Sequence, residues 1–209
     1  MADHAHKAHG RTTDRRQQIL QVSAELFAER GYAATTVRNI AERTGLLSGS
    51  LYHHFDSKEA ILDEILTEFV GGLVRRADEA LAVATHDARA ALEQLVAVNL
   101  RAIEDHRSAI LLLQNDWALL RTEPRFAHLV DEGRHIDRVW LSVLEQGQAQ
   151  GTFRRDMAPE LVWRFLRDAV WMAARWYEPG REHSIDGIAR QYADVVFRGI
   201  ASPAGESSP

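Results

Sequence analysis

Apolar side chains recur at intervals of three and four residues along almost the whole chain, a pattern typical of amphipathic helices. The first such helix runs from Thr13 to Arg30, and Gly31 supplies its C-terminal stop. The same spacing predicts eight more helices, near residues 35–44, 48–55, 56–84, 88–105, 108–121, 125–150, 160–178 and 185–200. No segment alternates strictly between apolar and polar residues, as a strand would. The sequence therefore predicts an all-α protein of about nine helices.

Residues suited to helix ends mark several of these boundaries. Thr35 or Thr36 can cap the second helix, and Ser48 can cap the third. The run Asp56-Ser57-Lys58-Glu59 has the form of a capping box at the start of the long helix that follows. The later helices are divided by Asp105-His106-Arg107, Pro124, Gly151, Pro159 and Pro179-Gly180.

The helices group into a small head and a larger body. We expect a helix-turn-helix domain at 12–58 and a ligand-binding and dimerisation domain at 59–201. Residues 1–11 and 202–209 have little to bury and are expected to form flexible tails. With 209 residues, 45 % of them apolar, the chain is long enough to bury a substantial core.

The head has the form of a DNA-reading motif, because two short helices are joined by a turn that contains Gly45. The second of these helices is expected to enter the major groove. It offers small residues that let the backbone approach DNA, and longer ones that reach base edges: Ser48, Gly49, Ser50, Tyr52 and His53. Flanking phosphates are expected to be bound by Thr36, Arg38 and Lys58.

The distribution of charge agrees with a polyanion-binding head. Residues 1–58 contain eight Lys or Arg and six Asp or Glu, whereas residues 59–209 contain 17 and 24, within a net charge of -5. A basic end on an acidic protein is a weak electrostatic indication of nucleic-acid binding. There is no cysteine, which excludes disulfides and thiol catalysis, and no signal peptide or membrane span is recognisable. We expect a cytoplasmic protein.

Neither catalysis nor a metal is expected. There is no glycine-rich phosphate loop, no metalloprotease motif and no nucleophile elbow. Four residues spaced for one helix face could ligate a metal or form a solvated surface: His128, Asp131, Glu132 and His135. Nothing in the sequence supplies a second shell for such a site, so we predict no metal and no cofactor.

The head resembles the N-terminal signature of the tetracycline-repressor (TetR) family. The residues that carry the resemblance are 27–32 (FAERGY), 35–41 (TTVRNIA), Gly45, 51–55 (LYHHF) and 57–59 (SKE). They span about 45 residues in the right order, which is far more specific than a single motif. The resemblance implies an all-helical homodimer with a DNA-binding head and a ligand-binding body, acting as a repressor released by a small molecule.

A wider set of residues resembles one branch of that family, the repressors of the later, ring-degrading stage of cholesterol catabolism in actinobacteria. It comprises 46–55, 124–126, 162–168 and 170–177. This resemblance implies an inducer that is a coenzyme A thioester of a partly degraded steroid. Two alternatives stay open: a TetR-type repressor of a different apolar ligand, such as a fatty acyl thioester or a drug, and a ligand-independent architectural DNA-binding protein.

A stripe on the helix at 160–178 suits an anionic ligand with an apolar body. Arg167, Trp171 and Arg175 are spaced by four residues and therefore share a face. Arginine pairs with phosphate or carboxylate, and indole packs on fused rings or adenine. The structural alternative is that Arg167 pairs with Asp168 and Trp171 lies in a dimer core. Three other aromatic residues are expected in the ligand pocket wall or the core: Trp117, Phe126 and Trp140.

The last two helices are the candidate dimer face. The helix at 160–178 is apolar nearly all round, and the helix at 185–200 has an apolar stripe. Two such helices from each subunit would form a four-helix interface. The residues expected there are Trp163, Val170, Ile188, Tyr192 and Val195. The alternative is that both helices simply close the core of the monomer.

Overall fold

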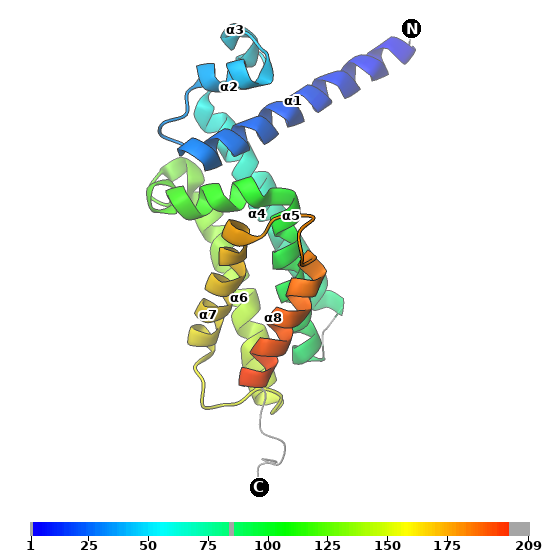
Figure 1. Ribbon diagram of the computed structural model, residues 1–209, viewed down its shortest axis with the longest axis vertical. Coiled ribbons are helices and arrows are strands. Elements are labelled where there is room, and N and C mark those ends of the chain that lie inside the picture. The colour runs from blue at the N-terminus through cyan, green and yellow to red at the C-terminus, as the bar shows by residue number, and fades with distance from the viewer. Residues whose placement is uncertain (1, 84–85, 201–209) are drawn as a thin grey trace. The chain divides into compact units, whose positions relative to one another are not determined.

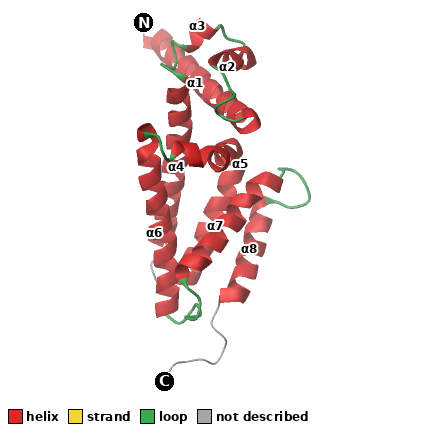
Figure 2. Cartoon of the chain, turned by 90° about the vertical axis from the view of Figure 1, so that its left-hand side faces the viewer, coloured by secondary structure: helices red, strands yellow, loops and turns green. Residues whose placement is uncertain are grey.

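The computed structural model describes residues 2–83 and 86–200, with side chains for 14–82 and 86–200. This part of the chain holds helices and no β-strand (Figures 1 and 2). The elements are α1 (Ala2–Arg30), α2 (Val37–Thr44), α3 (Ser48–Leu51), α4 (Lys58–Val83), α5 (Ala88–Leu120), the 3-10 turn η1 (Pro124–Phe126), α6 (Ala127–Ala149), α7 (Pro159–Trp176) and α8 (Ile185–Ile200). The predicted all-α class is confirmed. No described helix is both long and apolar enough to cross a membrane.

Glycine and proline end or begin the helices where the sequence predicted. Gly31 and Gly45 follow α1 and α2 with φ of 83° and 68°, a left-handed conformation that glycine adopts without a Cβ clash. Pro124 and Pro159 begin η1 and α7, because the first turn of a helix needs no backbone donor from its first residue.

Of the three helix N-caps predicted from the sequence, the structure confirms one. Thr36 caps α2, since its hydroxyl oxygen accepts a hydrogen bond of 3.2 Å from the backbone N–H of Asn39. Ser48 was predicted to cap α3, but the N-cap is Leu47, which makes no side-chain capping bond. A capping box at 56–59 would place the cap of α4 at Asp56. In the structure the cap is Ser57, whose hydroxyl accepts a hydrogen bond of 3.1 Å from the backbone N–H of Ala60.

The described helices number eight rather than nine, because two predicted helices are continuous. The polar break at residues 105–107 becomes a kink within α5, where His106 alone leaves the helical region (φ -132°, ψ 26°). That break contains no proline or glycine, so the backbone bends without ending the helix. α1 begins at Ala2 instead of Thr13, since no proline interrupts the preceding residues and an existing helix is easily extended. The predicted tail at 202–209 lies outside the described residues.

Packing divides the chain into two compact units. The head unit comprises Met1–Phe69 and Ser108–Ala127, and the body unit comprises Val70–Arg107 and His128–Pro209. α4 and α5 each contribute to both units. The sequence assigned 108–127 to the body, because local pattern does not reveal which distant segment a helix packs against.

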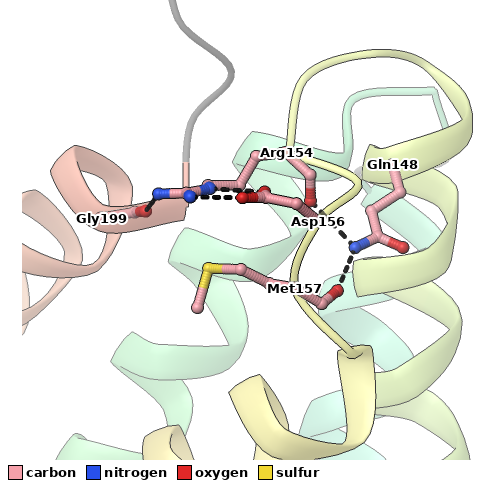
Figure 3. A network of polar contacts seen from close by, with 5 residues as sticks. All are labelled: Gln148, Arg154, Asp156, Met157 and Gly199. Atoms are coloured by element: carbon pink, nitrogen blue, oxygen red, sulfur yellow. Dashed lines mark hydrogen bonds and ion pairs between the residues drawn. The ribbon is translucent and has the colours of Figure 1, made fainter.

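In the body unit, the loop between α6 and α7 is held to the end of α8 by polar contacts (Figure 3). The Arg154 guanidinium donates to the Asp156 carboxylate at 2.7 and 2.5 Å and to the Gly199 carbonyl at 3.4 Å. The Gln148 side chain donates to the carbonyls of Arg154 and Met157 at 3.0 and 2.7 Å. The bonded Arg154 guanidinium lowers the pKa of Asp156.

Candidate functional site

The helix-turn-helix presents the predicted recognition residues on its outer side. Leu51 and Phe55 are buried in the head core, as their spacing of four residues predicted. The side chains that alternate with them lie outward: Ser48, Gly49, Tyr52 and His53 are exposed, and Ser50 is half-buried. No heavy atom lies within 4 Å of the position that a Cβ on Gly49 would take, so the backbone there is open to close approach.

Of the three predicted phosphate contacts, two are exposed and one is engaged within the head. Thr36 and Arg38 are exposed at the start of α2, where Arg38 pairs with Glu42 at 2.8 Å. Lys58 instead donates through Nζ to the carbonyls of Tyr32 and Thr35 at 2.9 and 2.8 Å. Its ammonium also lies 4.2 Å from the centre of the Tyr32 ring. Lys58 therefore fixes the α1–α2 loop to the start of α4.

The same loop is fixed by a tyrosine and two acidic side chains. The Tyr32 hydroxyl donates to the Glu59 carboxylate at 2.9 Å, and the Tyr32 backbone N–H donates to Asp116 at 3.4 Å. Burial, reinforced by that carboxylate, raises the pKa of Tyr32 well above its usual range. The Glu59 pKa is lowered, mainly by a hydrogen bond from its own backbone N–H.

Arg16 joins α1 to the end of the recognition segment, a role that the sequence did not reveal. Its guanidinium forms a two-point contact with the Glu64 carboxylate at 2.8 and 2.5 Å. It also donates to the His54 carbonyl and lies 4.0 Å from the centre of the Phe55 ring. One planar side chain thus braces α1, α4 and the residues that follow Tyr52. Its partners lie 38 to 48 residues away, so no local pattern could have identified it.

We expect Arg16→Met to weaken DNA binding about fivefold, equivalent to roughly 1 kcal/mol for lost charge-assisted hydrogen bonds at a half-exposed site. Fluorescence anisotropy with labelled duplex would measure it. Arg16→Lys is the control, because it keeps the positive charge but not the planar fork. If Lys restores full affinity, the effect of Arg16 is general attraction to phosphate and the bracing role is wrong.

The stripe predicted to bind ligand lies along α7 in the body unit. Trp171 is half-buried and Arg175 is exposed. Arg167 pairs with Asp168 through its Nε and Nη2 atoms, each 3.0 Å from Oδ1. Both partners of this pair are substantially exposed, and such pairs contribute only about 0–1 kcal/mol. An incoming phosphate or carboxylate can therefore replace Asp168 at little cost.

Trp140 lies in the body core, stacked on Trp163 with ring centres 4.6 Å apart and planes inclined by 25°. The Trp163 indole N–H donates to Asp137 at 2.9 Å. The Trp140 indole N–H, in a side chain only 1 % exposed, has no acceptor among the described residues. A buried donor without an acceptor is costly, so this N–H is a candidate to bind a polar atom of a ligand or a water.

In the part of the chain that the structure describes, two charged groups of the body unit are also buried without a hydrogen-bond partner. Arg76 was missed in the sequence analysis, and Glu132 was considered only as a metal ligand or part of a solvated surface. The Nε and Nη2 atoms of Arg76 on α4 and Oε2 of Glu132 on α6 are buried with no hydrogen-bond partner among the described residues. A guanidinium cannot lose its charge in a protein, so its buried donors need acceptors from elsewhere. Only contacts in three dimensions reveal an unpartnered group, since paired arginines look the same in sequence.

The remaining predicted residues are distributed as follows. Trp117, half-buried, and Phe126, buried, belong to the head unit, whereas Trp140 and the α7 stripe belong to the body unit. His135 contacts Asp78 at 2.9 Å and Asp131 pairs with Arg134, so these side chains have partners other than a metal. No cluster of three or more metal-ligating side chains occurs among the described residues.

The expected dimer residues require a correction. Trp163, Val170 and Ile188 are at most 5 % exposed within a single chain, so they belong to its own core. Tyr192 is half-buried and donates to the Ala169 carbonyl at 3.2 Å, and Val195 is exposed. The outer side of α7 is also apolar, with four exposed side chains: Leu161, Phe165, Met172 and Trp176. A helix apolar all round gives no sequence signal for which side faces inward.

Comparison with known proteins decides the family. Residues 19–65 match the family model described as "Bacterial regulatory proteins, tetR family", and residues 85–200 match that described as "Tetracyclin repressor-like, C-terminal domain". The chain belongs to the TetR family. The predicted resemblance is confirmed, and the helix-turn-helix of this TetR regulator is its DNA-binding element.

Several similar proteins in the family are repressors. The chain is 46 % identical over 189 residues to the HTH-type transcriptional repressor KstR2 of Rhodococcus jostii strain RHA1. The matched region covers 90 % of this chain and 92 % of that protein. The structure of the ketosteroid transcriptional regulator KstR2 of Mycobacterium tuberculosis matches with a TM-score of 0.87 at 39 % identity, covering 90 % of this chain and 96 % of that one. This TetR protein is thus a transcriptional repressor homologous to KstR2, and its family and relatives are regulators rather than enzymes.

Proposed function

We propose that this TetR repressor binds its operator as a homodimer and is released by a coenzyme A thioester of a steroid degradation intermediate. The observation that carries the proposal is the 46 % identity with KstR2 across nine tenths of the chain, since another KstR2 is described as a ketosteroid regulator. A TetR-fold protein at 19 % identity, AibR, has been solved with isovaleryl coenzyme A and operator DNA. A protein of this fold can therefore bind a coenzyme A thioester as well as operator DNA.

The unpartnered polar groups of the body support a ligand that is both large and polar. Trp140 and Arg76 offer buried donors, which suit the keto or carboxylate oxygens of an oxidised ring system. Arg167 and Arg175 lie on α7 one turn either side of Trp171, where they suit the phosphates of coenzyme A. A purely apolar ligand would leave the buried donors of Trp140 and Arg76 unsatisfied.

The outer apolar side of α7 supports the dimer. Leu161, Phe165, Met172 and Trp176 are spaced by four, seven and four residues, so they form one stripe along the helix, and each is at least half exposed. Val195 adds an exposed apolar side chain on α8. A stripe of this size is unfavourable in water, and a two-fold axis through it would bury the same stripe from both subunits.

Release follows from linkage between the two ligands. A dimer reads two half-sites only when its recognition helices match successive major grooves, about 34–36 Å apart or a multiple of this. The inducer needs only to bind more tightly to a dimer whose recognition helices have another spacing. DNA affinity then falls by the ratio of the inducer's affinity for that dimer to its affinity for the DNA-binding dimer. Operator DNA must weaken inducer binding by the same factor. α4, which contributes to both units, is the candidate for the element that shifts.

The deciding experiment is fluorescence anisotropy of a labelled fragment from the region upstream of the gene. Protein is titrated first, followed by a steroid-derived coenzyme A thioester and, separately, its free acid. Release by the thioester alone supports the proposal. Tight DNA binding that responds to neither compound contradicts the inducer, and a fatty acyl thioester and a drug are then tested. Equal affinity for the thioester with and without operator contradicts the linkage.

We expect Arg167→Met to raise the thioester concentration needed for half-release about tenfold, since a charge-assisted hydrogen bond is lost, while DNA affinity is unchanged. Tyr52→Ala is expected to do the reverse, weakening DNA binding and leaving thioester binding intact. Both are measured by the same titrations. Arg134→Met, an exposed arginine of α6 that likewise pairs with a nearby aspartate, is the matched control. A folded Arg167→Met protein with a normal response removes Arg167 from the site.

A further inference from the structure

Leu47 occupies an unusual position for a leucine, the N-cap of α3. Its carbonyl accepts from the backbone N–H groups of Ser50 and Leu51 at 2.9 and 3.3 Å, but its side chain cannot accept from the first-turn donors. Leucine is among the least favourable N-cap residues, and Ser, Thr, Asp and Asn are preferred. The preceding helix of the same motif follows the preference, with Thr36 in a complete capping box.

The Leu47 side chain also adds nothing to the packing of the head. It is 79 % exposed, the most exposed large hydrophobic side chain in the described part of the chain, whereas Leu46 is half-buried and Leu51 is buried. A single exposed leucine is ordinary on a protein surface. This one lies at the start of the recognition helix, the part of a helix-turn-helix that meets base edges. A residue that breaks a local preference without a structural gain is a candidate for function.

The chemistry of leucine restricts what it could recognise in DNA. It has no hydrogen-bonding group, so it can read neither a guanine nor a cytosine edge and cannot bind a phosphate. The apolar group that the major groove offers is the C5-methyl of thymine. The next residues, Ser48 and Gly49, are small and exposed, so they allow the helix start to approach the base pairs closely.

We propose that Leu47 packs against a thymine methyl group in each operator half-site and specifies thymine there. Leu47 is then a specificity-determining residue, alongside the polar contacts expected of Tyr52 and His53. The proposal rests on operator binding by the dimer and is independent of the inducer.

The test removes the methyl group from the DNA instead of altering only the protein. Wild-type protein first selects an operator from a random-sequence duplex library, and each thymine of that operator is then replaced in turn by 2′-deoxyuridine. One thymine in each half-site should lower wild-type affinity about fourfold when its methyl is removed, as expected for one buried methyl group. Leu47→Ser removes the contact from both half-sites, so it should bind the unmodified operator about sixteenfold more weakly. It should also be insensitive to the same replacement.

Two further proteins separate recognition from folding. Leu47→Ser places a favourable cap at α3, so its melting temperature should equal or exceed that of the wild type. Leu119→Ser alters another exposed leucine of the head unit, on α5, and should keep the wild-type profile of uracil sensitivity.

The outcomes are distinct. The proposal is overturned if no thymine is sensitive to uracil in the wild type, or if Leu47→Ser shows the same sensitive thymines. If the wild type enriches no sequence from the library, operator binding itself fails, and the proposed function falls with it.

Discussion

Phe165→Glu is expected to yield a folded monomer that binds operator DNA more than about a hundredfold more weakly than the wild type, because one head alone reaches one half-site. Phe165 is 66 % exposed in the single chain, so a charge there meets water and should not unfold the subunit. In the proposed dimer the same carboxylate would be buried against the partner's apolar stripe without a counter-charge, which is strongly unfavourable. Sedimentation equilibrium gives the mass, and anisotropy gives the affinity.

Two variants separate this effect from a general effect of added charge. Phe165→Leu keeps the stripe apolar and should remain dimeric. Leu119→Glu places the same charge at an exposed leucine outside α7 and α8, and should also remain dimeric. If Phe165→Glu sediments as a dimer and binds operator normally, the outer side of α7 is not the dimer face.

Gly147→Ala is expected to destabilise the protein by about 3 kcal/mol, the upper part of the usual range for overpacking a core. A Cβ at Gly147 on α6 would lie 2.0 Å from Cδ2 and 2.3 Å from Cε2 of Phe153. Phe153 cannot move aside easily, because it is buried, its ring stacks on Phe197 at 6.2 Å, and its N–H donates to the Gly147 carbonyl at 3.0 Å. For a chain of this size the melting temperature should fall by roughly 6–12 °C, measured by circular dichroism.

The same helix contains the matched control. Gly133 also lies on α6, and no heavy atom lies within 4 Å of the position its Cβ would take. Gly133→Ala should therefore stabilise the protein slightly, by about 0.5–1 kcal/mol, since alanine loses less conformational entropy in a helix. If Gly147→Ala has the same melting temperature as the wild type, the ring of Phe153 can move aside, and its closeness to Gly147 does not limit the side chain at this position.

The sequence by itself determined the helical class and most of the helix ends. Gly31 and Gly45 stop α1 and α2, and Pro124 and Pro159 begin later elements, because a left-handed φ or a missing N–H acts locally, whatever lies nearby. The motif residues of the head also identified the family, since they all lie in order within one short stretch of the sequence. Local signals were less decisive at His106, where a polar run bends α5 without ending it.

Only the tertiary structure decided which groups have partners and which side of a helix faces inward. Lys58 was expected at phosphate, yet its ammonium donates to two backbone carbonyls, and Arg16 was overlooked, although it braces the recognition segment. Trp163 and Phe165 stand two positions apart on α7, one in the core and one exposed, and the apolar pattern does not distinguish them. The physical reason is that periodicity records hydrophobicity around one helix, whereas burial and pairing depend on segments far away in the sequence.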